Sequence, residues 1–278
     1  MMQLFHDVSY QCSRFATHRY STSFSSAIKL LHKDIQRPIY NIYGFVRFAD
    51  EIVDTFHEYD KEELLNEFKA ETYKAIERRI SLNPILNSFQ ITVNEFEINL
   101  NLIDAFFKSM EYDLHKRSYD ANGYKDYVYG SAEVVGLMCL NIFCEKDIVK
   151  YEKLTPFAQS LGAAFQKVNF LRDVKSDYQL LERTYFPEVD FRNFTAVSKK
   201  EIENEIMADF TNAYEGITQL PLKARFGVYV AYKYYLSLFR KIKRTQAEKI
   251  LDQRIRIPNY SKALIVVRAG VKNRFKLI

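Results

Sequence analysis

Apolar residues recur every three or four positions along most of the chain, as in Leu64, Leu65 and Phe68. An α-helix turns once every 3.6 residues, so this spacing predicts helices with one buried face. Glycine and proline are scarce, with 8 and 6 in 278 residues, and break the pattern rarely. The predicted helices cover residues 21–33, 38–58, 61–80, 95–116, 123–144, 148–180, 198–217, 221–248 and 259–272.

Prolines lie where helix starts and connections are expected. Pro38 fits a first helical turn, because proline has no backbone hydrogen to donate there, while Pro84, Pro187 and Pro221 fall in predicted connections. No glycine- or serine-rich linker, low-complexity run or long repeat divides the chain. The pattern therefore predicts one all-α domain over residues 1–278.

Composition narrows the function. Aromatic residues make up 15% of the chain, and such side chains fill cores or line apolar cavities. The net charge of +5 is spread out, which disfavours nucleic-acid binding and favours mild attraction to an anionic membrane surface. Three cysteines without a CxxC pair and five scattered histidines fit a reducing compartment and give no zinc, disulfide or histidine-built metal framework.

The sequence predicts neither a signal peptide nor a membrane-spanning helix. The first residues, MMQLFHDVSYQCSRF, lack the apolar core of a signal peptide. The most apolar helical stretch, 134–144, is shorter than the roughly 20 residues that a spanning helix needs. We therefore expect a cytoplasmic protein without a membrane span, with peripheral contact at the inner face of the cell membrane as an option.

Two apolar helices each carry a pair of aspartates four residues apart, Asp50 with Asp54 and Asp173 with Asp177. Positions i and i+4 share a helix face, so the two charges of each pair repel unless a cation lies between them. Mg²⁺ favours such oxygen ligands and completes its shell with water and phosphate oxygens. One such pair could arise by chance, but two in apolar surroundings favour a metal site.

Basic, aromatic and amide side chains accompany the acid pairs. Arg47 and Arg172 could donate to a bound anion. In the competing structural interpretation, Arg47 pairs with Glu51 one turn later on a solvated face. The residues in line with the two pairs are Tyr43 and Arg47 on the first helix and Gln166 and Asn169 on the second.

From about Ser21 to Lys262 the chain resembles the squalene and phytoene synthase family, the head-to-head prenyltransferases. STSFSSAIKLL is similar to the early S-[RK]-S-F segment of the family, and IYGFVRFADEIVD to its first aspartate motif. YVYGSAEVVGLM resembles Y-x-Y-x-x-A-G-x-V-G-x-M. LGAAFQKVNFLRDVKSD followed by ERTYFP is similar to the second aspartate motif with R-x-Y-x-P behind it, and this combination is the most specific.

The resemblance implies an isoprenoid-synthase-type helical bundle around a central apolar cavity, with the two aspartate motifs facing each other across its mouth. Mg²⁺ or Mn²⁺ held by Asp50, Asp54, Asp173 and Asp177 would bind the diphosphates of two prenyl substrates and neutralise the leaving group. The apolar cavity would shield the allylic cations from water. A cyclopropylcarbinyl diphosphate would form first and then rearrange to a linear product.

The resemblance also implies individual roles, each with a structural alternative. Tyr43, Tyr127 and Tyr235 match reaction-centre tyrosines, although core packing explains a buried tyrosine equally well. Ser23 could belong to a helix N-cap, and Gly136 could serve a helix contact. The residues matched to catalysis are Tyr43, Tyr127, Tyr235 and Asn169; those matched to substrate binding are Ser23, Phe24, Arg47, Arg172, Arg254, Lys262, Gln166, Val135 and Gly136.

Two positions depart from the family pattern. Thr22 stands where a basic residue is usual between the two serines, and Arg19 could substitute for that charge. Glu133 stands where glycine is usual. Its side chain could narrow the cavity, pair with a lysine or arginine, or point away, and the sequence leaves these three options open.

The motif sequences are most similar to those of bacterial family members from carotenoid pathways. This predicts condensation of two geranylgeranyl diphosphates to phytoene, without NADPH. One alternative joins two farnesyl diphosphates into squalene, dehydrosqualene or hydroxysqualene, and another is a non-catalytic helical scaffold or assembly factor. Chain-elongating prenyltransferases are disfavoured because their first motif resembles DDxxD, whereas this chain has DEIVD. The sequence fixes neither the substrate length, nor the oligomeric state, nor the base that ends the reaction.

Overall fold

The computed structural model describes residues 1–116, 118–179, 184–187, 189, 194–252 and 254–274, without the side chains of 176–179 and 252. Within these ranges the chain has no strand, only an isolated bridge between Ser118 and Thr184. The all-α prediction is confirmed. The helices are α1 (Met2–Tyr20), α2 (Thr22–Ile28), α3 (Lys33–Asp54), α4 (Lys61–Arg78), α5 (Pro84–Phe96), α6 (Leu100–His115), α7 (Ala121–Val128), the π turn η1 (Tyr129–Glu133), α8 (Val134–Cys144), α9 (Ile148–Gln179), α10 (Ala196–Gln219), α11 (Leu222–Arg244), α12 (Ala247–Asp252) and α13 (Asn259–Arg274).

Helices α1 and α5 were not predicted; the buried face of α1 is mostly polar, and that of α5 mixes polar residues with the apolar Ile85, Leu86, Phe89 and Val93. Buried side chains of α1 include Ser9 and Ser13, and those of α5 include Asn87 and Ser88. They bond to one another across the interface: Asn87 Nδ2 donates to Ser9 Oγ at 2.9 Å, and the hydroxyls of Ser13 and Ser88 lie 2.7 Å apart. The buried face of α1 therefore shows no apolar period.

Some predicted boundaries were also wrong. Helix α3 begins at Lys33, so Pro38 lies inside the helix rather than in its first turn. Pro84 is not in a connection but is the first residue of α5, where its missing N–H costs no helical hydrogen bond. The predicted helix 221–248 ends at Arg244, and Thr245 and Gln246 separate it from α12.

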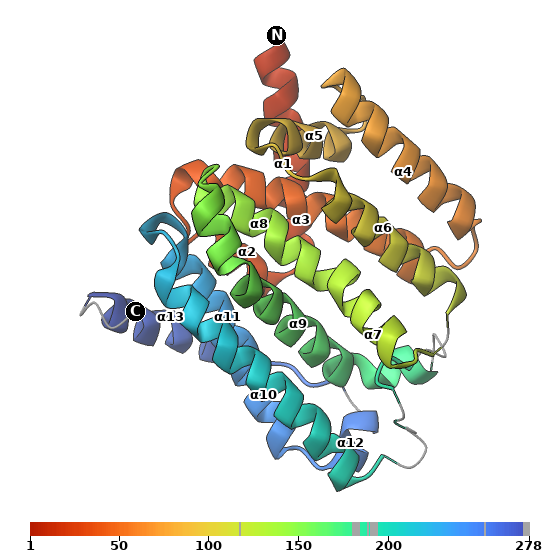
Figure 1. Cartoon of the computed structure of the whole chain (residues 1–278), viewed down its shortest axis with the longest axis vertical. Helices are drawn as coiled ribbons and strands as arrows, with labels where there is room; N and C mark the ends of the chain where they lie inside the picture. The colour runs from red at the N-terminus through yellow and green to blue at the C-terminus, as the bar shows by residue number, and fades with distance from the viewer. Residues whose placement is uncertain (117, 180–183, 188, 190–193, 253, 275–278) are drawn as a thin grey trace.

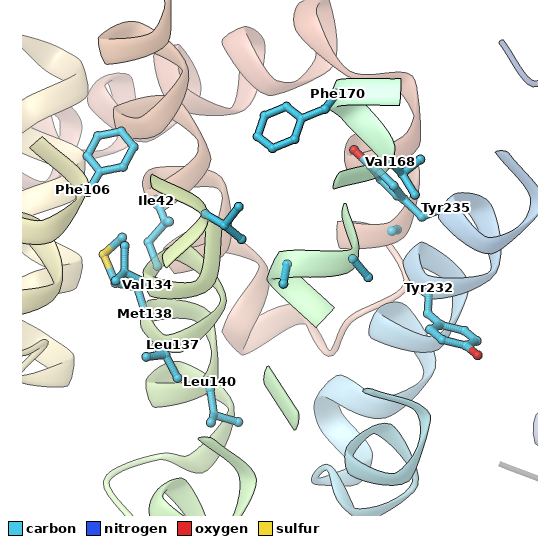
Figure 2. Packing of buried hydrophobic residues seen from close by; sticks show 14 of the residues in the cluster. Ile42, Phe106, Val134, Leu137, Met138, Leu140, Val168, Phe170, Tyr232 and Tyr235 are labelled. Carbon is cyan, nitrogen blue, oxygen red and sulfur yellow. The ribbon is translucent and has the colours of Figure 1, made fainter. Parts of the chain in front are cut away.

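The central helices hold the two predicted aspartate motifs. In Figure 1, α9 runs through the middle of the molecule between α8 and α10, with α1, α4 and α5 at the top and α12 at the bottom. The buried apolar residues form one contiguous cluster. Figure 2 shows Val134 and Met138 of α8 beside Ile42 of α3, with Phe170 of α9 and Tyr235 of α11 across from them.

Residues 121–144 form one continuous helical run in which η1 is a single π turn. By length and composition this run could cross a bilayer, which differs from our expectation, but half of its apolar window is buried within the protein. The π turn is packed closely on both sides. A Cβ on Gly130 would lie 2.4 Å from the carbonyl oxygen of Ala105 in α6, and one on Gly162 of α9 would lie 2.6 Å from that of Ala132.

Candidate active site

The first aspartate motif lies at the end of α3, where Asp50 and Asp54 are both half-buried. Arg47 Nη1 donates to Asp50 Oδ2 at 3.2 Å, and the same guanidinium pairs with Glu51 and lies 4.4 Å from the centre of the Tyr20 ring. Its Nε is buried, and no hydrogen-bond partner for it occurs among the described residues. Arg47 is therefore not a solvated surface residue, and its terminal nitrogens pair with Asp50 and Glu51.

The second motif lies near the end of α9. Arg172 Nε donates to both oxygens of Asp173 at 3.0 Å, and Arg254 Nε lies 2.8 Å from Asp173 Oδ1. Arg254 comes from the segment between α12 and α13, so two arginines distant in sequence converge on one carboxylate. The side chain of Asp177 falls outside the described residues.

Four rings from four helices pack together between the two motifs: Phe24 of α2, Tyr43 of α3, Phe165 of α9 and Tyr235 of α11. We call them the ring cluster. The Phe24 centroid lies 5.8 Å from that of Tyr43 and 5.6 Å from that of Tyr235, and the Phe165 and Tyr235 rings stack at 3.9 Å. Tyr235 Oη donates to Asn169 Oδ1 at 3.3 Å, one helical turn from Asp173. The ring cluster thus connects both aspartate helices.

The tyrosines of the ring cluster are neutral phenols at physiological pH. Burial raises the pKa of Tyr43 well above its usual value, and although the Arg47 guanidinium opposes this, Asp50 adds to it. Burial also raises the pKa of Tyr235, against the opposing charge of Arg172. A neutral ring presents a negative face that stabilises a nearby carbocation, whereas a phenol of raised pKa is a poor proton acceptor.

Tyr127 lies in a second aromatic stack. Its ring centroid lies 4.9 Å from Tyr119, 5.9 Å from Phe170 and 5.1 Å from Tyr185, and its hydroxyl donates to the buried Asp113 Oδ2 at 2.7 Å. Burial, and then the Asp113 carboxylate, raise the pKa of Tyr127. Its hydroxyl is thus held by Asp113, and its ring packs against Tyr185, which follows α9.

The structure places a basic group at the position where Thr22 departs from the family pattern. Lys262 Nζ of α13 donates to Thr22 Oγ1 at 2.6 Å, and burial lowers the pKa of this ammonium. Ser21 caps α2, because its Oγ accepts from the backbone N–H of Phe24 at 3.1 Å. The N-cap is therefore not Ser23, which lies one residue inside the helix.

The remaining matched residues lie on α8 and α9. Val135 is half-buried, and a Cβ on Gly136 would lie 3.0 Å from the carbonyl oxygen of Ala158, so the contact between α8 and α9 accounts for this glycine. Asn169 Nδ2 donates to Gln166 Oε1 at 3.5 Å on the face that leads to Asp173. These two amides and the carboxylate therefore form one polar stripe.

Glu133 contacts α9, next to the contact of α9 with α10. Gln159 Nε2 donates to Glu133 Oε2 at 3.1 Å. The positive charge of Lys167 also acts on the Glu133 carboxyl. Lys167 itself lies 2.7 Å from Asp209 Oδ2 and 2.5 Å from Glu205 Oε1. Of the three options that the sequence left open, the structure shows Glu133 bonded to an amide in the field of a lysine.

Glu133 makes stability depend on pH. Burial raises the pKa of its carboxyl from 4.5 to about 7, with Lys167 opposing the shift and Asp209 adding to it. The folded state thus prefers the protonated form, so the stabilisation is present below pH 4.5 and is lost as the pH rises through 7. We expect Glu133→Gln to reduce the fall in Tm between pH 5 and pH 8 by about 2–4 °C in thermal unfolding. The exposed Glu97→Gln should leave the fall unchanged, and an unchanged fall in Glu133→Gln would contradict the prediction.

Sequence reasoning missed Phe165, Asp113 and Tyr20. The first two carry a signal in hindsight: Phe165 precedes Asn169 by one turn on the same face, and Asp113 continues the buried stripe of Phe106 and Met110 at helical spacing. Tyr20 carries none, because its role depends on how α1 packs against α3.

The donor set fits a divalent ion that is bound together with a diphosphate. No group of three or more histidine, cysteine, aspartate or glutamate side chains close enough to hold a metal occurs among the described residues. Asp50 and Asp54 nevertheless share a face of α3, and Mg²⁺ commonly takes one or two carboxylates plus phosphate and water oxygens. Arg47 pairs with Asp50, while Arg172 and Arg254 pair with Asp173, so each motif has next to it the basic donors that a diphosphate would need.

Comparisons with known proteins identify a family for this chain. The family model for squalene/phytoene synthase covers residues 17–261. A 4,4'-diapophytoene synthase of Staphylococcus haemolyticus is 27% identical over 72% of this chain and 70% of its own, and a phytoene synthase of Cereibacter sphaeroides is 26% identical over 83% and 70%. A crystal structure of a dehydrosqualene synthase in complex with ligand superposes with a TM-score of 0.81 at 19% identity, over 97% of this chain and 98% of that one.

Proposed function

Since this chain belongs to the squalene/phytoene synthase family, and is thus a prenyltransferase with the all-α isoprenoid synthase fold, we propose that it condenses two geranylgeranyl diphosphates to phytoene. The observation that carries the proposal is the ring cluster between two carboxylate motifs and four basic side chains. Head-to-head condensation needs these features together, because an anion must leave while an apolar surface holds the cation.

Each set of side chains has a distinct task in this proposal. Arg47 and Lys262 bind diphosphate oxygens on the side of α2 and α3, and Arg172 and Arg254 do so on the side of α9. When bound at the aspartates, Mg²⁺, with Mn²⁺ as a substitute, neutralises the charge that develops on the leaving diphosphate. The basic side chains orient the same diphosphate, so that the allylic carbon lies against the ring cluster.

The ring cluster handles the carbon skeleton. Its uncharged tyrosines and phenylalanines exclude water and present π faces to the allylic cation. The double bond of the second substrate attacks the allylic cation, and loss of a proton from the first carbon of that substrate closes the ring of a cyclopropylcarbinyl diphosphate. Loss of its diphosphate gives a second cation, which rearranges and loses a proton to form the linear product. Tyr43 and Tyr235 stay protonated because their pKa is raised, so neither supplies a phenolate as the final base, and released diphosphate is the base that we propose. We also propose that the reaction needs no NADPH.

Two farnesyl diphosphates are the second candidate substrate pair. The similarity to a 4,4'-diapophytoene synthase, at an identity close to that with a phytoene synthase, favours this alternative specifically. A non-catalytic scaffold is disfavoured, because a scaffold gains nothing from paired carboxylates that repel each other on one helix face.

Competition between the two substrates tests the proposal. With Mg²⁺ and equal concentrations of both diphosphates, without NADPH, we expect the forty-carbon triene to be the main product by chromatography and mass spectrometry. A thirty-carbon product as the main species would mean that farnesyl diphosphate, and not geranylgeranyl diphosphate, is the preferred substrate. A product that forms only with NADPH would indicate squalene synthesis instead.

We further propose that residues 1–278 act as one catalytic domain in the cytoplasm, in peripheral contact with the cell membrane. The support is chemical: the substrates are amphipathic, and the product is a hydrocarbon that does not dissolve in water. A membrane is the phase that can accept such a product.

A further inference from the structure

Helix α1 buries small, mostly polar residues and exposes large apolar ones, which is the reverse of an ordinary surface helix. Its buried face carries small, mostly polar residues, among them Ser9, Ser13 and Thr17. Large apolar residues lie on the outside instead: Leu4, Val8 and Phe15 are 68%, 51% and 67% exposed. A helix of a globular protein normally buries its apolar stripe, and small buried residues with an apolar outer surface are typical of helices in contact with lipid.

The outer apolar residues of α1 border a groove with a volume of 1210 Å³. One wall is α1, another is Phe48 of α3, and the end of the groove is the start of α5. Apolar surface exceeds polar surface in this lining. The lining residues that matter for the argument are Leu4, Val8, Phe15, Arg19, Tyr20 and Phe48.

The charge beside the groove is basic. Arg14 and Arg19 are exposed within about one turn on either side of Phe15, and the Arg19 guanidinium lies 5.9 Å from the Phe15 ring centroid. The one acid in the lining, Asp7, is neutralised by Arg37, whose Nη1 donates to it at 2.9 Å. The outer face of α1 therefore combines apolar side chains with two arginines.

We propose that this face of α1, with its groove, is the surface through which the protein docks on an anionic lipid bilayer. Leu4, Val8 and Phe15 would enter the interface, and Arg14 and Arg19 would reach the headgroup phosphates. A second copy of the chain fits less well. In a two-fold dimer the same face meets itself, which would bring the arginines of both copies together without an acidic partner.

The groove is also connected to the candidate active site. Tyr20 lines the groove, and its ring lies under the guanidinium of Arg47, which is bound to Asp50. A bilayer against α1 would thus lie next to the first aspartate motif, where amphipathic substrates arrive and a hydrocarbon product leaves. This last step depends on the proposed function; the docking surface itself does not.

Vesicle co-sedimentation of the full chain tests the proposal. We expect binding to vesicles of phosphatidylglycerol and phosphatidylcholine, and weaker binding to phosphatidylcholine alone. The triple variant Leu4→Gln, Val8→Gln, Phe15→Gln should bind the anionic vesicles about tenfold more weakly or worse. The double variant Arg14→Gln, Arg19→Gln should lose most of the preference for anionic vesicles. All substituted side chains are exposed, and circular dichroism checks that the variants are folded.

A matched control changes three equally exposed apolar residues elsewhere: Val149→Gln, Val197→Gln and Leu222→Gln, at the starts of α9, α10 and α11. This control should bind like the unchanged chain. Unchanged vesicle binding by the α1 triple variant would overturn the proposal, as would a dimer in analytical ultracentrifugation that the α1 substitutions dissociate. Vesicle binding through α1 by a chain without prenyl diphosphate turnover would support this inference and refute the proposed function.

Discussion

Asp50→Asn is expected to lower turnover of prenyl diphosphates by about a thousandfold or more, because the substitution removes a ligand from the ion that stabilises the leaving group by several kcal/mol. The fold should survive: the Asp50 side chain is 36% exposed, and such substitutions change stability little. Steady-state kinetics with Mg²⁺, together with circular dichroism, measure both effects. Asp173→Asn should be equally inactive, but it also breaks the pairs with Arg172 and Arg254.

Glu51→Gln is the matched control for Asp50→Asn. Both carboxylates pair with Arg47 and both lie on α3, but only Asp50 belongs to the repeated aspartate pattern. We expect Glu51→Gln to lose less than about tenfold, the upper range for a single partly exposed ion pair. Equal losses in the two variants would mean that the positioning of Arg47, rather than a metal ligand, explains the effect. Full activity of Asp50→Asn would exclude the metal role.

Lys262→Gln should weaken two processes together, substrate use and inhibition by inorganic pyrophosphate. A hydrogen bond to a charged ligand is worth about 1.5–3 kcal/mol, so KM and the inhibition constant of pyrophosphate should both rise tenfold or more. Because burial lowers the pKa of Lys262, its affinity for diphosphate should also fall as the pH rises through the pKa of this lysine. Initial rates at several pyrophosphate concentrations and pH values measure these changes.

Lys272→Gln controls for the loss of a positive charge on α13. Lys272 is exposed on the same helix, three turns from Lys262, and should leave both constants unchanged within a factor of about two. If Lys262→Gln leaves pyrophosphate inhibition unchanged, its contact with Thr22 is a surface hydrogen bond and not part of a diphosphate site.

How far the fold could be predicted depended on what each helix buries. The helix at 61–80 was predicted and is observed as α4, because Leu65 and Phe68 are apolar and buried at helical spacing. Helix α1 escaped prediction because Ser9, Ser13 and Thr17 lie on its buried face, whereas the buried apolar residues of α5 could have been found from their spacing. An apolar period measures burial only when the core is apolar.

Some residues of the candidate site could be found from the sequence, and others could not. Asp50 and Asp173 could be found from the sequence, because repelling acids at i and i+4 on apolar helices need an explanation within one helix. The contact of Lys262 with Thr22 spans most of the chain length, and that of Tyr127 with Asp113 joins two helices. Such pairs depend on how helices pack, which local spacing does not encode.

Product analysis after incubation with a single substrate tests the central claim most directly. With purified protein, Mg²⁺ and geranylgeranyl diphosphate, we expect a forty-carbon linear hydrocarbon with a central conjugated triene, and the release of two diphosphates for each product molecule. Isotope labelling at the first carbon of the substrate should place both labels at the centre of the product. Release of diphosphate with only a prenyl alcohol, or no turnover of either prenyl diphosphate, would contradict head-to-head condensation by this chain.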